Sequence, residues 1–178
     1  MRRPPKSALA ALSAGEKAAV LDRLLTGRAD LRKLAETYAA ERLSAGDREA
    51  VAADVGNALQ CLDIDELNGR AGPQPGRGYV HPVEAAAEIL DEALQPFLDD
   101  LARRAGLGMS ASAVELAAGV LLGLYRCRDG GAGSLLEESP DYAHERAPAV
   151  VDQCARLGLE LPAAELLDLM PEWGTVLR

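Results

Sequence analysis

One stretch of the chain is apolar around the whole circumference of a helix. Residues 112–126 read SAVELAAGVLLGLYR, in which apolar side chains fall on every side of a helix. A helix without a polar face has to be surrounded by other helices, and this one is too short to span a bilayer, which takes about 20 apolar residues. We therefore expect a buried central helix over residues 112–126, with Ser112 and Glu115 as a capping box at its start.

Two glycines, Gly119 and Gly123, lie four residues apart on one side of this central helix. Glycine lowers helix stability by about 1 kcal/mol relative to alanine. Two glycines on the same side of a buried helix therefore indicate the close approach of a neighbouring helix.

Residues 13–68 carry the periodicity of three further helices, after a tail and a short helix over residues 1–12. Ser13 and Glu16 form a capping box for the first of the three. The joints are short, so we expect antiparallel neighbours. In the first two helices the apolar positions expected to face inward are Val20, Leu21, Leu24, Leu25, Leu31, Leu34, Ala35 and Tyr38.

Residues 69–81, GRAGPQPGRGYVH, interrupt the helical pattern with glycine and proline, and we expect a loop there. Helical periodicity returns over residues 82–178. Its longest apolar stripe begins at Pro82 and contains Pro96, which we expect to kink the helix because proline removes one backbone hydrogen bond. A later helix is expected to begin at Ser139–Pro140.

These elements predict an all-α, single-domain bundle of seven or eight helices around the central helix. We expect the helical part over residues 82–178 to pack with the N-terminal part as one domain. Only 3% of the residues are aromatic, so the core has to be built from Leu, Ala and Val. That composition favours close helix packing over a sheet, and no segment shows the alternation typical of a strand.

The net charge of −9 is distributed unevenly. Residues 1–60 hold ten Lys/Arg and eight Asp/Glu, a net charge of +2, whereas residues 61–178 hold nine and twenty, a net charge of −11. An acidic chain is repelled by phosphate backbones, so we do not expect nucleic acid as a partner. The start of the chain, MRRPPK, lacks the apolar run of a signal peptide, and no segment is long enough to span a membrane. We expect a cytoplasmic protein that does not bind membranes.

One DNA-binding alternative stays open. Residues 16–43 have the outline of a helix-turn-helix, with Arg28, Arg32 and Lys33 near the second helix. Any helical hairpin shows this outline, and the overall acidity of the chain argues against DNA binding.

The sequence contains no signature of a catalytic, metal or cofactor site. His81 and His144 are the only histidines and lack the spacing of a di-metal site in a helical bundle. The three cysteines, Cys61, Cys127 and Cys154, are far apart and are best interpreted as small buried hydrophobic residues. We expect no metal or cofactor. The leading hypothesis is a non-enzymatic protein–protein interaction or regulatory module whose partner is another protein.

Five residues are candidates for docking a partner. Glu84, Glu88, Asp91 and Glu92 form an acidic row on the longest predicted helix, where ordinary solvation of an amphipathic helix is the alternative. Trp173 is the fifth, because Trp is enriched at interface hot spots. A homodimer through Trp173 is one hypothesis, and a C-terminal segment that covers its own core is the other.

Four arginines are candidates for binding a small anion. Arg70 and Arg77 lie in the first glycine-rich segment, and Arg126 and Arg128 flank the second, at residues 129–134. Glycine lets backbone N–H groups approach an anion, and arginine binds it with two hydrogen bonds. A simple linker is the alternative interpretation of these glycine-rich segments.

The C-terminal end resembles small acidic all-helical chaperones of redox enzymes, in the GLEL step at Gly158–Leu161 before a proline-containing last helix. The acidic Pro–Asp–His type of motif of that family is absent, and the corresponding stretch reads LPAAELLDLMPEW. The resemblance implies a chaperone-like function as a further alternative.

Overall fold

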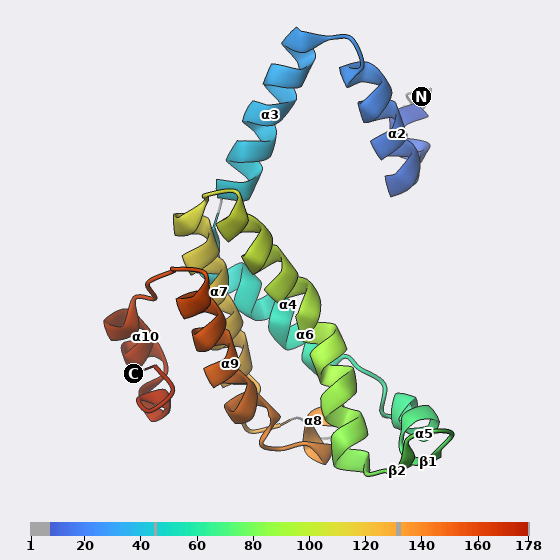
Figure 1. Ribbon diagram of the computed structural model, residues 1–178, viewed down its shortest axis with the longest axis vertical. Coiled ribbons are helices and arrows are strands. Elements are labelled where there is room, and N and C mark those ends of the chain that lie inside the picture. The colour runs from blue at the N-terminus through green and yellow to red at the C-terminus, as the bar shows by residue number, and fades with distance from the viewer. Residues whose placement is uncertain (1–7, 45, 131–132, 178) are drawn as a thin grey trace, which may run out of the picture. The chain divides into compact units, whose positions relative to one another are not determined.

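The computed structural model describes residues 8–44, 46–130 and 133–177 (Figure 1). Contacts within the chain divide it into two compact units, Met1–Arg42 and Leu43–Arg178. All buried side chains among the described residues belong to the larger unit. The three helices expected over residues 13–68 are therefore divided between the two units.

The fold is an all-α, single-domain helical bundle, which confirms the fold class predicted from the sequence. The longer helices are α2 (Ala14–Leu25), α3 (Ala29–Ser44), α4 (Arg48–Gln60), α6 (Pro82–Gly106), α7 (Ser110–Arg126), α9 (Tyr142–Arg156) and α10 (Ala163–Leu169). Three single turns of helix are α1 (Ala8–Ala11), α5 (Leu67–Arg70) and α8 (Leu135–Glu138). Two 3-10 turns are η1 (Ile64–Glu66) and η2 (Pro171–Trp173).

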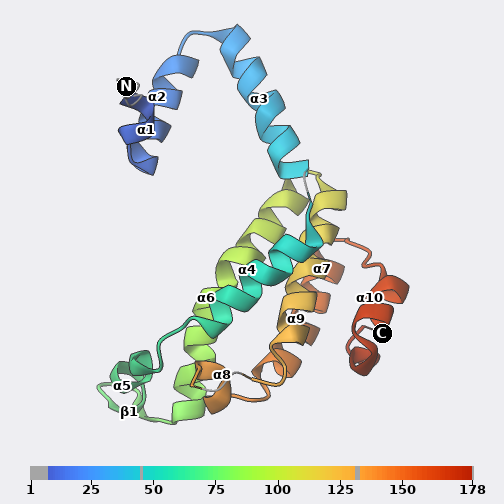
Figure 2. The same ribbon diagram turned by 180° about the vertical axis from the view of Figure 1, so that it is seen from behind.

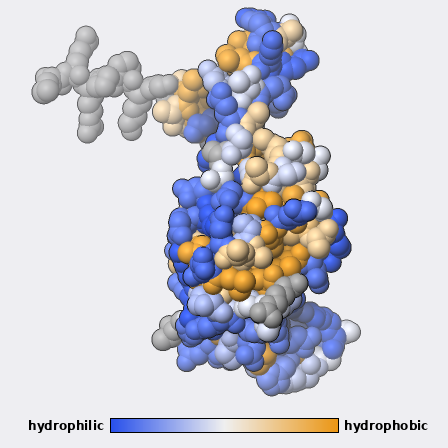
Figure 3. All heavy atoms as spheres, turned by 90° about the vertical axis from the view of Figure 1, so that its left-hand side faces the viewer, coloured by the Kyte–Doolittle hydropathy of each residue, from blue (hydrophilic) through white to orange (hydrophobic). Residues whose placement is uncertain are grey.

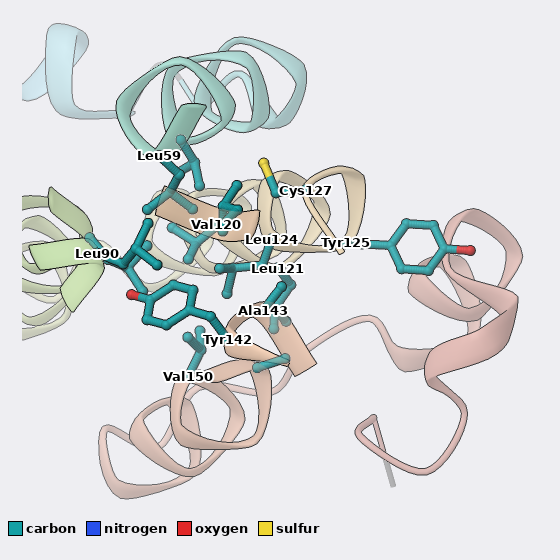
Figure 4. Packing of buried hydrophobic residues seen from close by; sticks show 14 of the residues in the cluster. Leu59, Leu90, Val120, Leu121, Leu124, Tyr125, Cys127, Tyr142, Ala143 and Val150 are labelled. Carbon is teal, nitrogen blue, oxygen red and sulfur yellow. The ribbon is translucent and has the colours of Figure 1, made fainter. Parts of the chain in front are cut away.

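Helix α7 lies at the centre of the larger unit, as predicted. It contacts α4, α6, α9 and α10, and Figures 1 and 2 show α4, α6 and α9 around it. Twelve of its 17 residues are buried. In the close-up of Figure 4, side chains of α4, α6 and α9 converge on the leucines of α7, among them Leu59, Leu90 and Tyr142.

The start of α7 differs from the prediction. The helix begins at Ser110, so Ser112 lies inside the first turn and its hydroxyl donates to the Met109 carbonyl at 3.2 Å. Glu115 does not complete a capping box, because its carboxylate accepts hydrogen bonds from Arg48 of α4. Arg48, a residue of another helix, therefore binds the carboxylate that the sequence pattern predicted to cap α7.

The two glycines of α7 lie against α4, which confirms the close approach predicted for them. A Cβ atom added at Gly119 would lie 2.6 Å from Cβ of Val51 and 2.8 Å from the Arg48 carbonyl oxygen. At Gly123 it would lie 2.7 Å from Cβ of Val55. Hydrogen at these two positions is what allows the backbones of α4 and α7 to come this close.

One helix boundary in the second half of the chain differs from the prediction. The helix expected from Ser139–Pro140 begins at Tyr142, because Ser139 instead caps the C-terminal end of α8. Helices α6 and α9 continue through Pro96 and Pro148. Both prolines are exposed, so water can satisfy the backbone carbonyls that lose their partners.

The glycine-rich segment expected as a loop contains a short antiparallel hairpin of β1 (Gly72–Gln74) and β2 (Gly78–Val80). The Arg77 N–H donates to the Gln74 carbonyl at 3.2 Å. The intervening Pro-Gly pair suits this turn, since proline presets its own φ and Gly76 has a positive φ of 80°. Three residue pairs are too few to show strand alternation in the sequence.

The smaller unit contains no buried side chain in α1, α2 or the described part of α3 before residue 43. The capping box of Ser13 and Glu16 is present, as predicted. The prediction that the stripes of α2 and α3 face inward is wrong, however. Two short helices can cover only one side of each other, and the rest of their apolar surface stays exposed.

The three cysteines have no disulfide partner. Cys127 and Cys154 are buried, as expected, and burial raises the pKa of both thiols, to about 11 for Cys154. Cys61 is exposed at the C-terminal end of α4, where the prediction of burial is wrong.

Replacing Gly119 or Gly123 by Ala is expected to lower the free energy of unfolding by about 1–3 kcal/mol, because the added methyl group overpacks the α4–α7 contact. The matched control is Gly56→Ala in α4, where an added Cβ meets no atom within 4 Å. Better helix propensity should raise stability there by up to about 1 kcal/mol. Urea denaturation measures all three, and equal effects at the three positions would contradict this account of the packing.

Candidate functional site

Arginines of the hairpin region cover part of the acidic row on α6. Arg70, at the end of α5, donates to both carboxylate oxygens of Glu92 at 2.5 and 2.7 Å. Arg77, between β1 and β2, donates to Glu88 at 3.1 Å and lies 3.8 Å from Glu84. The structure thus brings two of the predicted anion-binding arginines onto three of the predicted docking carboxylates.

These ion pairs keep the carboxylates ionised. The hydrogen bond from Arg77 lowers the pKa of Glu88, and the hydrogen bond from Arg70 lowers the pKa of Glu92. Neither group can therefore serve as a proton donor at neutral pH. A basic partner that docked here would have to displace two arginines of the same chain.

The fourth carboxylate of the row, Asp91, belongs to a contact between α6 and α9. It accepts a hydrogen bond from the buried Tyr142 hydroxyl at 3.0 Å and another from Arg146. Burial raises the pKa of Tyr142 well above its usual range, and the neighbouring Asp91 carboxylate adds to this effect. Asp91 therefore joins two helices of the bundle.

The arginines at the second glycine-rich segment are also paired. Arg126 donates to Glu49 of α4 at 2.8 Å. Arg128 donates to Glu172 at 2.8 Å, and its guanidinium carbon lies 4.0 Å from the centre of the Tyr125 ring. Each of the four predicted anion-binding arginines thus has a carboxylate partner of its own, and anion binding stays a prediction.

Trp173 lies inside its own fold, with 2% of its surface exposed. Its ring meets Tyr125 of α7 edge to face, with 5.2 Å between the ring centres, and lies 6.4 Å from the His144 ring. Figure 4 shows the Tyr125 side chain pointing away from the leucines of α7 toward the C-terminal segment. A partner could reach Trp173 only if this segment moved.

A cleft of about 720 Å³ lies beside Arg48. The Arg48 guanidinium is held by Glu115 at 2.9 Å and Glu165 at 3.5 Å. The Gly158–Leu161 step, which carries the resemblance to redox-enzyme chaperones, forms one wall. Glu160 also lines the cleft, so one arginine faces three glutamates and the lining is net negative.

An apolar groove on the smaller unit is a feature that the sequence interpretation missed. Its seven lining residues are contributed by α2 and α3 and are called the α2–α3 groove: Leu21, Leu24, Leu25, Leu31, Leu34, Ala35 and Tyr38. It encloses about 190 Å³. Leu24 is 54% exposed and Tyr38 60% exposed. Figure 3, which draws one face of the molecule, shows hydrophobic residues at the surface of the N-terminal helices as well as of the larger unit.

Two of the three cations that suggested DNA binding are engaged within the smaller unit. Arg28 donates to both oxygens of Asp30, at 3.1 and 2.8 Å, and Arg32 lies 3.4 Å from the Leu25 carbonyl oxygen. These bonds close the turn between α2 and α3. DNA binding stays an untested prediction.

Among the residues that the structure describes, no group of His, Cys, Asp and Glu could hold a metal ion. In the same part of the chain, every helix is too short or too polar to cross a membrane. No family model, curated protein or solved structure matches the chain.

Replacing Tyr142 by Phe should lower the free energy of unfolding by about 1 kcal/mol at neutral pH, because the hydrogen bond to Asp91 is lost. The replacement should also make the free energy of unfolding fall less steeply as the pH rises into the alkaline range. The folded state keeps the phenol protonated, whereas the unfolded chain releases the proton near its usual pKa of about 10. The stabilisation of the folded state by the protonated Tyr142 phenol is complete when the pH is below the pKa of the unfolded chain, and it is lost as the pH rises above that pKa.

Urea denaturation at neutral pH and above about pH 10 measures both effects. Tyr79→Phe is the control, since Tyr79 is 69% exposed. If the Tyr142 variant loses stability with rising pH as steeply as the wild type, the explanation is wrong.

Replacing Trp173 by Ala should lower the free energy of unfolding by about 3–5 kcal/mol, because it leaves a cavity against Tyr125. Light scattering should give an unchanged mass for the folded variant. A variant that keeps its stability but has half the mass of the wild type would instead support an interface at Trp173.

Proposed function

We propose that the chain is a non-enzymatic protein–protein interaction module that binds its partner through the α2–α3 groove. One observation carries the proposal. Seven side chains, all of them apolar or aromatic, line a groove on helices that have no buried residue. Exposed apolar surface gathered in one place is typical of interaction sites, whereas single exposed apolar residues are ordinary.

Covering the apolar side chains of the groove would contribute part of the free energy of binding. Leu21, Leu24, Leu34 and Tyr38 are between 47% and 60% exposed. Complete burial of a large apolar side chain contributes about 2 kcal/mol. Covering four that are half exposed therefore contributes about 4 kcal/mol, to which polar contacts at the rim would add.

The other surfaces offer less support. The acidic row on α6 is covered by Arg70 and Arg77, and Trp173 is buried. These residues hold the larger unit together, so we move the proposed docking site from the row to the α2–α3 groove. The small-anion and DNA-binding alternatives would both require arginines to leave their present partners.

We also propose the cytoplasm as the compartment. The exposed thiol of Cys61 and the two buried thiols are unpaired. Thiols stay reduced in the cytosol, whereas oxidising compartments favour disulfides.

Affinity purification from the native cell tests the proposal. The wild-type chain is compared with Leu24→Glu/Leu34→Glu, which places two charges in the groove, and with Leu107→Glu as the matched control. Leu107 is 59% exposed and lies outside the groove. We expect a specific set of proteins, which includes other copies of the chain if it self-associates, to be retained by the wild type and the control and lost by the groove variant.

Two results would overturn the proposal. One is retention of the same proteins by all three versions. The other is the repeated absence of any partner together with measurable turnover of a small molecule by the purified chain.

A further inference from the structure

The β1–β2 hairpin of the larger unit has little apolar anchorage. Of the residues in its two strands, Val80 alone is buried. Figures 1 and 2 show the hairpin and α5 beside the first half of α6, away from α7 and α9. An isolated two-stranded hairpin is at best marginally stable in water, so this one depends on what holds it against its neighbours.

Two arginines hold the hairpin region against α6. Arg70, which lies just before β1, donates to both carboxylate oxygens of Glu92 at 2.5 and 2.7 Å. Arg77, in the turn between the strands, donates to both oxygens of Glu88, to one of them at 3.1 Å. The four side chains are between 35% and 62% exposed, so water and dissolved ions reach both pairs.

The chain can turn at the start of the hairpin. Gly72, the first residue of β1, has a positive φ of 89°, and a Cβ atom added there would meet no atom within 4 Å. Glycine changes its backbone conformation at low steric cost, and hinge residues absorb such changes at the ends of elements. The strands can therefore move relative to α6 while α5 and α6 remain folded.

The hairpin also forms one wall of a pocket of about 510 Å³. Gly72 and Tyr79 line the pocket on the hairpin side, whereas Leu67 of α5, Pro82 of α6 and Glu138 of α8 line it opposite them. A volume of this size is typical of small-molecule sites. Any movement of the hairpin would therefore change the shape of the pocket.

We propose that the β1–β2 hairpin is a salt-sensitive lid, which the Arg70–Glu92 and Arg77–Glu88 pairs hold closed against α6 and which opens when these pairs are screened or displaced. Each exposed pair is weak and is screened by salt. Two bidentate pairs together keep the lid closed at low ionic strength, and high ionic strength or a competing cation releases it. The hairpin belongs to the larger unit, so this behaviour does not depend on what the α2–α3 groove binds.

Digestion of the full-length chain with chymotrypsin, followed by mass spectrometry, tests the inference. Tyr79 is an exposed residue of β2, but the peptide bond after it becomes available to the protease only when the hairpin leaves α6 and unfolds. Raising NaCl from about 10 mM to about 1 M shortens the Debye length from about 30 to about 3 Å. We expect this change to speed cleavage of the wild type after Tyr79 about tenfold.

Glu88→Gln/Glu92→Gln removes both pairs and should be cleaved after Tyr79 at the faster rate already at low salt. Its remaining dependence on NaCl measures the response of the protease itself. Glu49→Gln/Glu172→Gln is the matched control, because it removes two exposed ion pairs of the larger unit that lie outside the hairpin. The control should behave like the wild type at both salt concentrations.

Cleavage after the buried Tyr142 reports unfolding of the whole unit and should stay slow in every version. The salt response of the wild type tests the lid without any substitution. A wild-type rate after Tyr79 that follows the response of the protease alone overturns the lid. Equal acceleration in the control variant, or acceleration after Tyr142 in the same proportion as after Tyr79, overturns it as well.

Discussion

The close contact between α4 and α7 is the constraint on which the larger unit depends. Gly119 and Gly123 let the two backbones approach until only hydrogen atoms fit between them. Once α4 is in place, Arg48 reaches Glu115 and Glu49 reaches Arg126, so that two adjacent residues at the start of α4 pair with residues toward opposite ends of α7. The leucines of α7 are then left to face α6 and α9. The single direction in which α7 has no bulky side chain thus determines how the other helices surround it.

Most arginines of the larger unit pair with carboxylates of the same unit. Arginines of the hairpin lie on the carboxylates of α6, Arg146 lies on Asp91, and Arg128 lies on Glu172. Such pairs contribute little to stability where they are exposed, but they specify which surfaces meet. The smaller unit is organised in the opposite way. Its polar groups close a local turn, and its apolar groups are left at the surface.

The spacing of the apolar residues was sufficient to predict the helices. Their distribution around the whole circumference of residues 112–126 was sufficient to predict the buried centre, because both properties are local in the sequence. The unbroken apolar surface of α7 can be satisfied only inside a bundle. The same reasoning failed for Leu24 and Leu34, since an amphipathic stripe shows that a face needs a cover but not what covers it. It failed for Glu115 as well, because Arg48 lies 67 positions away in sequence. The residues of the α2–α3 groove could thus be named from the sequence, but that they line an exposed groove was found only in the structure.

The location of every described buried side chain in the larger unit has an evolutionary consequence. A substitution in α2 or α3 cannot open a cavity in the core, so the stability of the fold does not constrain these two helices. Under the proposed function, the similarity that they retain between species would come from what they bind. In related sequences, a groove that binds a partner would then change slowly in its lining while the outward faces of the same helices drift, and the contrast between the two faces would record the selection exerted by such a partner.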